Sequence, residues 1–185
     1  MSVRLQREIE KLKKHILALG TIVEERVHLA VSALDNRDEK LAREVIDKDI
    51  EIDHMEVELE EECLKLLALY QPVAIDLRFI IAVLKINNDL ERIGDLAVNI
   101  GERAAFLATR PKIHIPLKFS AMSKKVKSML RKSLDSLVKM DSALASQVCK
   151  ADDEVDAINR EMYKQVQEGI TRHPERIECL IHLLS

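Results

Sequence analysis

The chain has 185 residues, of which 47% are hydrophobic and 33% charged, a balance that supports a folded core and excludes an intrinsically disordered protein. Its formal net charge of −3 is not the strongly basic balance of a general nucleic-acid-binding protein, so we expect no nucleic-acid partner. Four glycines, four prolines and 3% aromatic residues, beside abundant Leu, Ala, Glu, Lys and Arg, favour helices over strands. We therefore expect an all-α fold.

Apolar residues at three- and four-residue steps predict three long helices in the first half of the chain. The first covers about 9–35. The second covers about 38–70, where Asp38 supplies an N-cap and the residue before Pro72 avoids the α region. The third covers about 73–107.

The segment 109–116 is the one convincing linker, because it contains two prolines and no helical periodicity. After it, apolar spacing predicts a fourth helix over about 117–140 and a fifth over about 142–169. A sixth helix begins at Pro174 and has only a short run before the sequence ends.

The two halves repeat each other. Residues 40–53 (KLAREVIDKDIEID) and 143–156 (ALASQVCKADDEVD) share Leu, Ala, Val, Asp, Glu and Asp at matching places without a gap. We therefore predict a first three-helix repeat over 1–110 and a second over 117–185 that is incomplete in its last helix. An incomplete bundle leaves apolar residues uncovered and favours association. These residues are Ile177, Leu180, Ile181, Leu183 and Leu184.

Pairs of carboxylates four residues apart recur along the chain. They are Asp49 with Asp53, Glu91 with Asp95, and Asp152 with Asp156. Residues four apart lie on one side of a helix, so two such pairs facing each other across antiparallel helices would repel unless cations or basic side chains lay between them. Oxygen ligands suit hard cations, so we expect iron, with manganese, magnesium and calcium as alternatives. A solvated acidic face with local ion pairs is the other interpretation.

The segment 71–100, QPVAIDLRFIIAVLKINNDLERIGDLAVNI, resembles the central signature of the PhoU family. Upstream, VIDKDIEIDHME and ECLKLLA resemble the family's preceding helix, and the two-unit arrangement spans the chain. The resemblance implies a six-helix fold of two similar three-helix bundles. It also implies a metal site made by Asp49, Asp53, Glu91 and Asp95, with Asp152 and Asp156 as half of a second site.

The same resemblance implies a function. PhoU proteins are cytoplasmic regulators that restrain phosphate-starvation signalling, and the expected partners are the ATPase of a phosphate ABC transporter and a sensor histidine kinase. We expect a homodimer, and a PhoU-like regulator of another transporter is an alternative. No nucleophile elbow, phosphate-binding glycine loop or catalytic triad order is present, so we do not expect an enzyme.

A second alternative is a ferritin-like di-iron oxidase or iron store. Glu25 with His28 and Glu51 with His54 have the three-residue spacing of the Glu-x-x-His ligands in such bundles. That class requires all of its ligands in one bundle core.

Three further features concern surfaces and location. Basic residues cluster on the predicted fourth helix, as a solvated face or a docking surface for an acidic partner or anionic membrane. They are Lys118, Lys124, Lys125, Lys127, Arg131, Lys132 and Lys139. Three separated cysteines, Cys63, Cys149 and Cys179, are expected to be buried thiols. The longest apolar run, 79–84, is too short to span a bilayer, and the charged N-terminus is unlike a signal peptide, so we expect a cytoplasmic protein.

Overall fold

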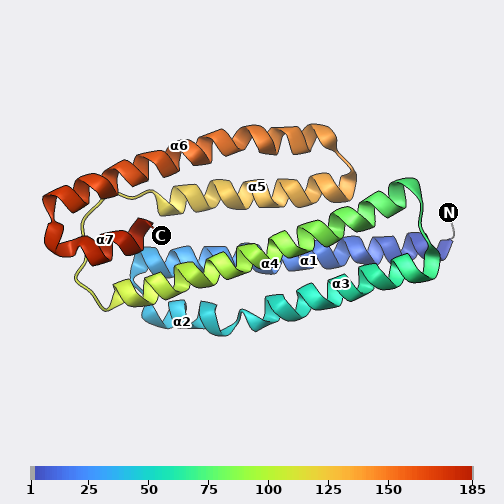
Figure 1. The fold of residues 1–185 in the computed structure, drawn as a ribbon, viewed down its shortest axis with the longest axis horizontal. Helices are drawn as coiled ribbons and strands as arrows, with labels where there is room; N and C mark the ends of the chain where they lie inside the picture. Colours follow the sequence, from blue (N-terminus) through green and yellow to red (C-terminus); the bar gives the residue numbers. More distant parts are fainter. Residues whose placement is uncertain (1–2, 185) are drawn as a thin grey trace.

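The computed structural model describes residues 3–184, which form helices joined by short segments, with no strand in that range (Figure 1). The expected all-α class is confirmed. The elements are α1 (Val3–Asn36), α2 (Glu39–Asp47), α3 (Ile50–Tyr70), α4 (Ala74–Ala108), α5 (Phe119–Lys139), α6 (Ser142–Arg172), the 3₁₀ turn η1 (Pro174–Arg176) and α7 (Ile177–Leu184). Within residues 3–184 no helix is long and apolar enough to cross a membrane.

The first bundle is built from α1, α2, α3 and α4, with its core along the middle of α1. Leu12 and Leu19 of α1 are fully buried and lie in one cluster with Leu59 of α3 and with Val83 and Leu90 of α4. Each such side chain contributes about 1.5–3 kcal/mol when it leaves water. The apolar periodicity of these helices therefore has the expected cause, a shared core.

The prediction of one continuous helix over 38–70 is wrong, because the structure divides this segment into α2 and α3 at Lys48 and Asp49. Asp38 caps α2 as expected, accepting a hydrogen bond from the backbone N–H of Leu41 at 3.0 Å. At the break, short-range bonds replace the helical pattern: the N–H of Asp49 donates to the carbonyl of Ile46 at 3.3 Å. The chain bends there without a glycine or proline.

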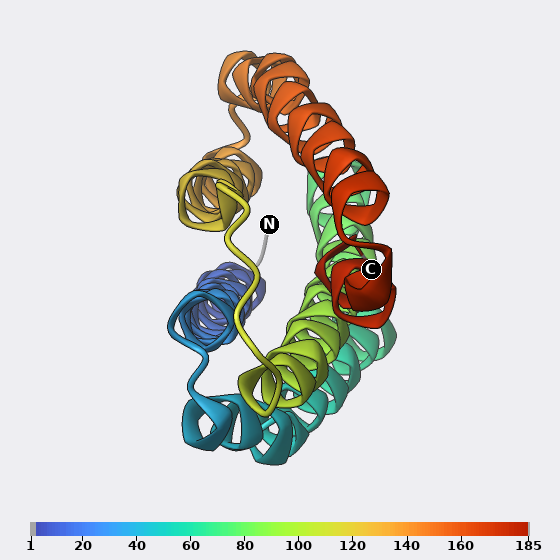
Figure 2. The ribbon, with the colours of Figure 1, turned by 90° about the vertical axis from the view of Figure 1, so that its left-hand side faces the viewer.

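The second half packs on the first through α5, which lies along α1, while α6 lies outside α5 (Figures 1 and 2). Leu134 of α5 is buried in the core cluster of the first bundle. It sits over Gly20, where an added Cβ would lie 2.1 Å from a Leu134 methyl. The glycine in α1 thus gives α5 room to approach.

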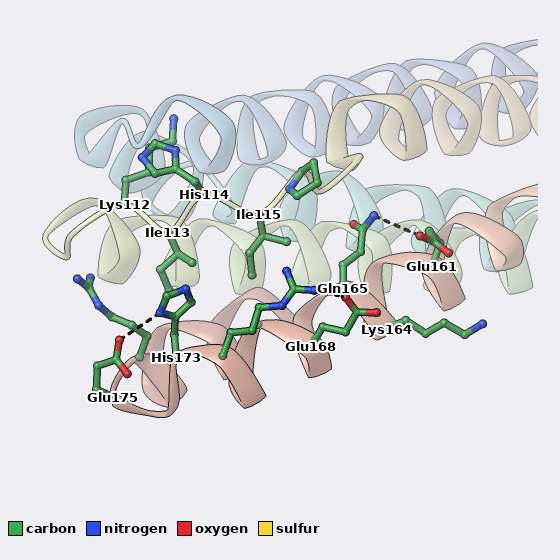
Figure 3. A pocket seen from close by; sticks show the side chains of 14 residues that line it. Lys112, Ile113, His114, Ile115, Glu161, Lys164, Gln165, Glu168, His173 and Glu175 are labelled. Carbon is green, nitrogen blue, oxygen red and sulfur yellow. Dashed lines mark hydrogen bonds and ion pairs between the residues drawn. The ribbon is translucent and has the colours of Figure 1, made fainter.

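The linker after α4 follows the end of α6. Ile113 and Ile115 point from the linker toward α6, where His173 and Gln165 lie (Figure 3). Together these segments enclose a cavity of about 550 Å³.

The last helix is only partly covered. Leu180 of α7 is fully buried, whereas Ile177 and Ile181 are 48% and 51% exposed.

The three cysteines differ in burial. Cys63 and Cys179 are buried, but Cys149 is exposed on α6, so the expectation of three buried thiols is wrong for Cys149. Burial raises the pKa of the Cys63 thiol to about 12.

Candidate functional site: a carboxylate cluster between α3 and α4

The carboxylate cluster forms where the start of α3 crosses the middle of α4. Asp49 stands at the α2–α3 break, and an added Cβ on Gly94 of α4 would lie 3.7 Å from Asp49 Oδ1. The same Cβ would lie 3.0 Å from a methyl of Ile52. Glycine at position 94 therefore lets the two helices, and the Asp49 carboxylate, approach closely.

The electrostatics join both predicted acid pairs of the first repeat. The pKa of Asp49 is raised by burial and by the charges of Asp53 and Asp95, and is opposed by Arg26. The pKa of Glu91 is raised by burial, by Asp95 and by Asp53. The charges of Asp53 and Asp95 thus oppose the ionisation of both Asp49 and Glu91.

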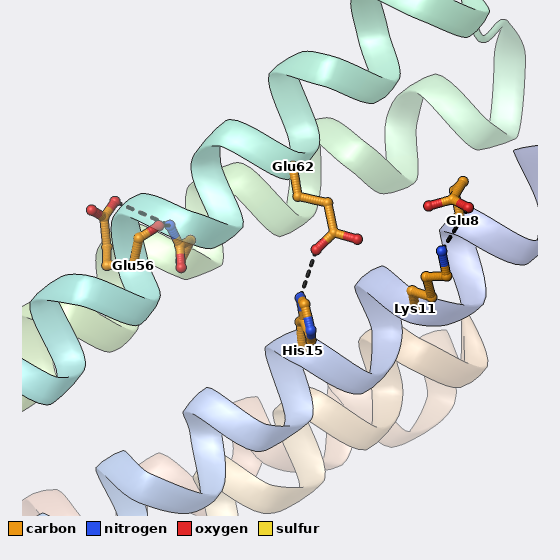
Figure 4. Close-up of polar contacts among 6 residues, drawn as sticks. Glu8, Lys11, His15, Glu56 and Glu62 are labelled. Atoms are coloured by element: carbon orange, nitrogen blue, oxygen red, sulfur yellow. Dashed lines mark hydrogen bonds and ion pairs between the residues drawn. The ribbon is translucent and has the colours of Figure 1, made fainter.

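Glu56 belongs to this cluster and was not among the predicted site residues. Its pKa is raised by burial, by Glu60 and by Asp53, and its charge also acts on Glu91. The buried amide of Asn87 on α4 donates to the backbone carbonyl of Glu56 at 2.8 Å and to its carboxylate at 3.0 Å (Figure 4). Glu56 stands four residues before Glu60, but neither of them was in the three predicted acid pairs.

Arg26 is the second residue that the sequence pattern did not single out. It is only 4% exposed, on α1, and donates from Nη2 to Glu51 Oε2 at 3.0 Å. Its charge acts on Asp49 in the opposite sense to the surrounding acids. One feature of the sequence could have indicated Arg26: it stands three residues after Val23, so it lies on the apolar side of α1.

The donor set fits a hard cation in its chemistry, with side-chain rotation still required. Asp49 Oδ1 is buried and accepts no hydrogen bond, which is a costly state for a carboxylate oxygen. Within residues 3–184, no three His, Cys, Asp or Glu side chains converge on one point where a metal ion could be held. The carboxylates of α3 and α4 thus act on one another electrostatically, but their side chains do not converge on a common point in the described residues.

The third acid pair has no facing acid helix in the described structure. Asp152 and Asp156 are exposed on α6, and Asp156 lies 3.6 Å from Arg160. α7, which would supply the opposite side of a second site, ends at Leu184. The half-site remains a prediction.

The ferritin-like alternative is not supported by the positions of its ligands. Glu25, His28, Glu51 and His54 are all exposed, so none enters a bundle core. Glu51 instead forms an ion pair with Arg26.

Two other charged regions are partly neutralised within the chain. On α5, Arg131 pairs with Glu24 at 2.7 Å, and Lys125 pairs with Glu154 of α6. In the 550 Å³ cavity, the three lining glutamates each have a partner, and Lys164 extends away from the linker (Figure 3).

The comparisons with known proteins identify the family of the chain. The model of the PhoU domain matches residues 16–104 and 119–185. The chain belongs to the PhoU family. The PhoU homologue of Aquifex aeolicus, a phosphate-specific transport system accessory protein, is 37% identical over 181 residues, which cover 98% of this chain and 82% of that protein. The homologue of Pseudomonas putida is 36% identical over 188 residues, covering all of this chain and 72% of its own length.

Solved PhoU structures share the fold. The crystal structure of PhoU from Pseudomonas aeruginosa superposes with a TM-score of 0.90 at 33% identity, covering 97% of this chain and 86% of that one. The phosphate transport system regulatory protein PhoU from Streptococcus pneumoniae superposes with a TM-score of 0.83 at 27% identity, covering 97% and 88%. The residues of the carboxylate cluster, from Asp49 to Asp95, lie within the first matched segment, 16–104.

Proposed function

We propose that this protein is an accessory regulator of phosphate transport that acts by binding other proteins. The observation that carries the proposal is the family membership over nearly the whole chain, since relatives at this identity bear the name of phosphate-specific transport system accessory proteins. The partners are the ATPase of a phosphate ABC transporter and a sensor histidine kinase in the cytoplasm, and the outcome is restraint of the starvation response. No catalytic step is part of this role.

The carboxylate cluster is the regulatory element in this proposal. Asp49, Asp53, Glu91 and Asp95 would hold a metal ion, iron first and manganese, magnesium or calcium as substitutes, with Asp152 and Asp156 contributing to a second site. The ion supplies positive charge between α3 and α4, whose carboxylates otherwise repel. Neutralising them fixes the angle between the two helices, and the outer faces of these helices form the docking surface.

A homodimer is part of the same proposal. Ile177 and Ile181 present exposed apolar side chains at the end of the second half, and a second copy would cover them. Light scattering on the free protein checks this, and a monomeric mass across the working concentrations would contradict it.

The decisive experiment measures binding to the purified transporter ATPase with Mn²⁺ and with chelator. Metal should tighten binding by about tenfold, the middle of the usual range for coupled sites. Glu91→Gln and Asp95→Asn should remove this gain. Asp89→Asn is the matched control, because Asp89 is an exposed carboxylate on the same helix outside the cluster.

The outcomes separate two parts of the proposal. Equal affinity with and without metal, in the wild type and in the variants, would reject the regulatory use of the cluster. Absence of any ATPase binding under either condition would reject the accessory role itself.

A further inference from the structure

A polar crevice lies between the end of α1 and the start of α5, away from the carboxylate cluster. Its volume is about 240 Å³. It is lined by His28, Val31, Ser32, Asp35 and Asn36 of α1 and by Ser120, Ser123, Lys124 and Lys127 of α5. Eight of these nine side chains carry a polar group, which is unusual for the contact between two packed helices.

The start of α5 is electropositive and has no acid of its own. Its first turn contains no acidic residue, and no side chain caps it. By contrast, Asp141 caps α6 by accepting from the N–H of Leu144 at 2.9 Å. A helix start attracts anions through its free N–H groups and its dipole, and Lys124 and Lys127 add two charges in the second and third turns.

Ser123 provides an independent observation at the same place. The residue is 7% exposed, and its hydroxyl is buried without a hydrogen-bond partner. An unpaired buried hydroxyl is destabilising, so a ligand that accepts from it would recover that cost. Ser32 also has a proton to donate, because its oxygen accepts from Asn36 Nδ2 at 3.2 Å.

The charge balance of the crevice leaves cations available for a ligand. Lys124 and His28 have no ion-pair partner among residues 3–184, and Lys127 has only a long contact of 3.6 Å with Glu24. The single acid is Asp35, whose Oδ2 accepts a hydrogen bond from the Ser120 hydroxyl at 2.5 Å. Asp35 therefore faces whatever anion the lysines attract.

A carboxylate in an anion site selects for anions that carry a proton. An ionised carboxylate only accepts hydrogen bonds, so sulfate would meet repulsion at Asp35 whereas hydrogen phosphate would donate its P–OH group to it. A phosphomonoester loses its last proton with a pKa of about 6. Above neutral pH it therefore resembles sulfate, while inorganic phosphate still keeps one proton.

We propose that this crevice binds inorganic phosphate, with Ser32, Ser123, Lys124 and Lys127 as donors and Asp35 as the acceptor of the ligand's proton. The small volume fits this ligand better than a nucleotide. The site uses none of the carboxylates of the α3–α4 cluster, so it stands or falls independently of the metal and partner proposals.

The test is calorimetric titration of the purified protein at pH 8 with inorganic phosphate, sulfate and glycerol phosphate. Phosphate should bind saturably, and the other two at least about tenfold more weakly, as for a lost hydrogen bond to a charged group. Lys124→Gln and Ser123→Ala should each weaken phosphate binding by about tenfold. Lys132→Gln is the control, since it removes the same charge from the exposed side of α5.

Two further readouts separate binding from folding. Ser123→Ala should keep or raise the thermal midpoint without phosphate, because it removes an unpaired buried hydroxyl, and yet lose the phosphate-induced rise. Asp35→Asn should let sulfate bind as tightly as phosphate. Absence of saturable phosphate binding by the wild type, or equal weakening by Lys124→Gln and Lys132→Gln, would overturn the proposal, and sulfate binding equal to phosphate in the wild type would do the same.

Discussion

At the scale of single residues, the carboxylate cluster is a balance between acids and one buried cation. The pKa of Asp49 is raised mainly by burial and then by the charges of Asp53 and Asp95, whereas the charge of Arg26 lowers it. Arg26 also forms an ion pair with Glu51, with 3.0 Å between Nη2 and Oε2. Because Arg26 is almost fully buried, its charge is weakly screened by solvent. It therefore competes with any cation that the carboxylates bind.

Arg26→Met should tighten Mn²⁺ binding to the cluster by about fivefold, since it removes a nearby positive charge and keeps the apolar stem in place. The measurement is competition of Mn²⁺ with a metal-sensitive dye at neutral pH. Arg43→Met is the control, because Arg43 is exposed and pairs with Glu39 on α2. Affinity that is unchanged or lower in Arg26→Met would contradict this account of Asp49.

At the scale of elements, the sequence predicted the helices well, whereas the metal site on them stays a prediction. The apolar spacing gave the extents of α1, α4, α5 and α6 to within a few residues at most ends, because these helices bury continuous faces. The break at Lys48 and Asp49 was missed, since the apolar positions continue across it, from Val45 to Ile52, without glycine or proline. Only the packing of α2 and α3 on different parts of α4 shows the bend, and this bend brings Asp49 onto Gly94.

The α3–α4 pair should lose stability as pH rises in the absence of metal. The carboxyl pKa values of Asp49, Glu56 and Glu91 are raised, so the folded state binds more protons than the unfolded state above their ordinary values, 3.8 for Asp49 and 4.5 for the two glutamates. The free energy of unfolding therefore falls as pH rises through that window. Urea unfolding in chelator between pH 4.5 and pH 7 measures the slope.

Two variants check the sign of this pH effect. Glu91→Gln should flatten the slope, because position 91 no longer titrates. Glu44→Gln should leave the slope between pH 4.5 and pH 7 nearly unchanged, since Lys48 lowers the pKa of Glu44 and its stabilisation is lost only below that range. If Glu91→Gln leaves the pH slope of the free energy of unfolding unchanged, Glu91 is not one of the groups that cause the slope, and this account is contradicted. Added Mg²⁺ or Mn²⁺ should remove the slope in the wild type if the cluster holds the ion.

At the scale of the whole molecule, the two halves meet along α1 and α5, and this arrangement could not be read from the repeat. Similar repeats specify similar bundles, but the contact between them depends on a few side chains of unlike helices. Leu134 fills the space over Gly20, while Glu24 receives Arg131 and Lys127 beside it. The glycine within an otherwise apolar helix was the one local signal of a close approach. The same interface forms the walls of the polar crevice, so its integrity also decides whether the crevice exists.

Apolar packing, and not the ion pairs, should hold the two halves together. Leu134 is 4% exposed, so Leu134→Ala should lower the free energy of unfolding by about 2–4 kcal/mol through lost contacts and a cavity. The side chain of Arg131 is 70% exposed although that of Glu24 is only 14% exposed, so solvent still screens the pair from the Arg131 side, and Glu24→Gln should cost about 1 kcal/mol. Denaturant unfolding of both variants at moderate salt measures the two costs, with Lys132→Gln as a surface control on α5. A larger loss in Glu24→Gln than in Leu134→Ala would mean that charge pairing, and not burial, sets the docking of the second half.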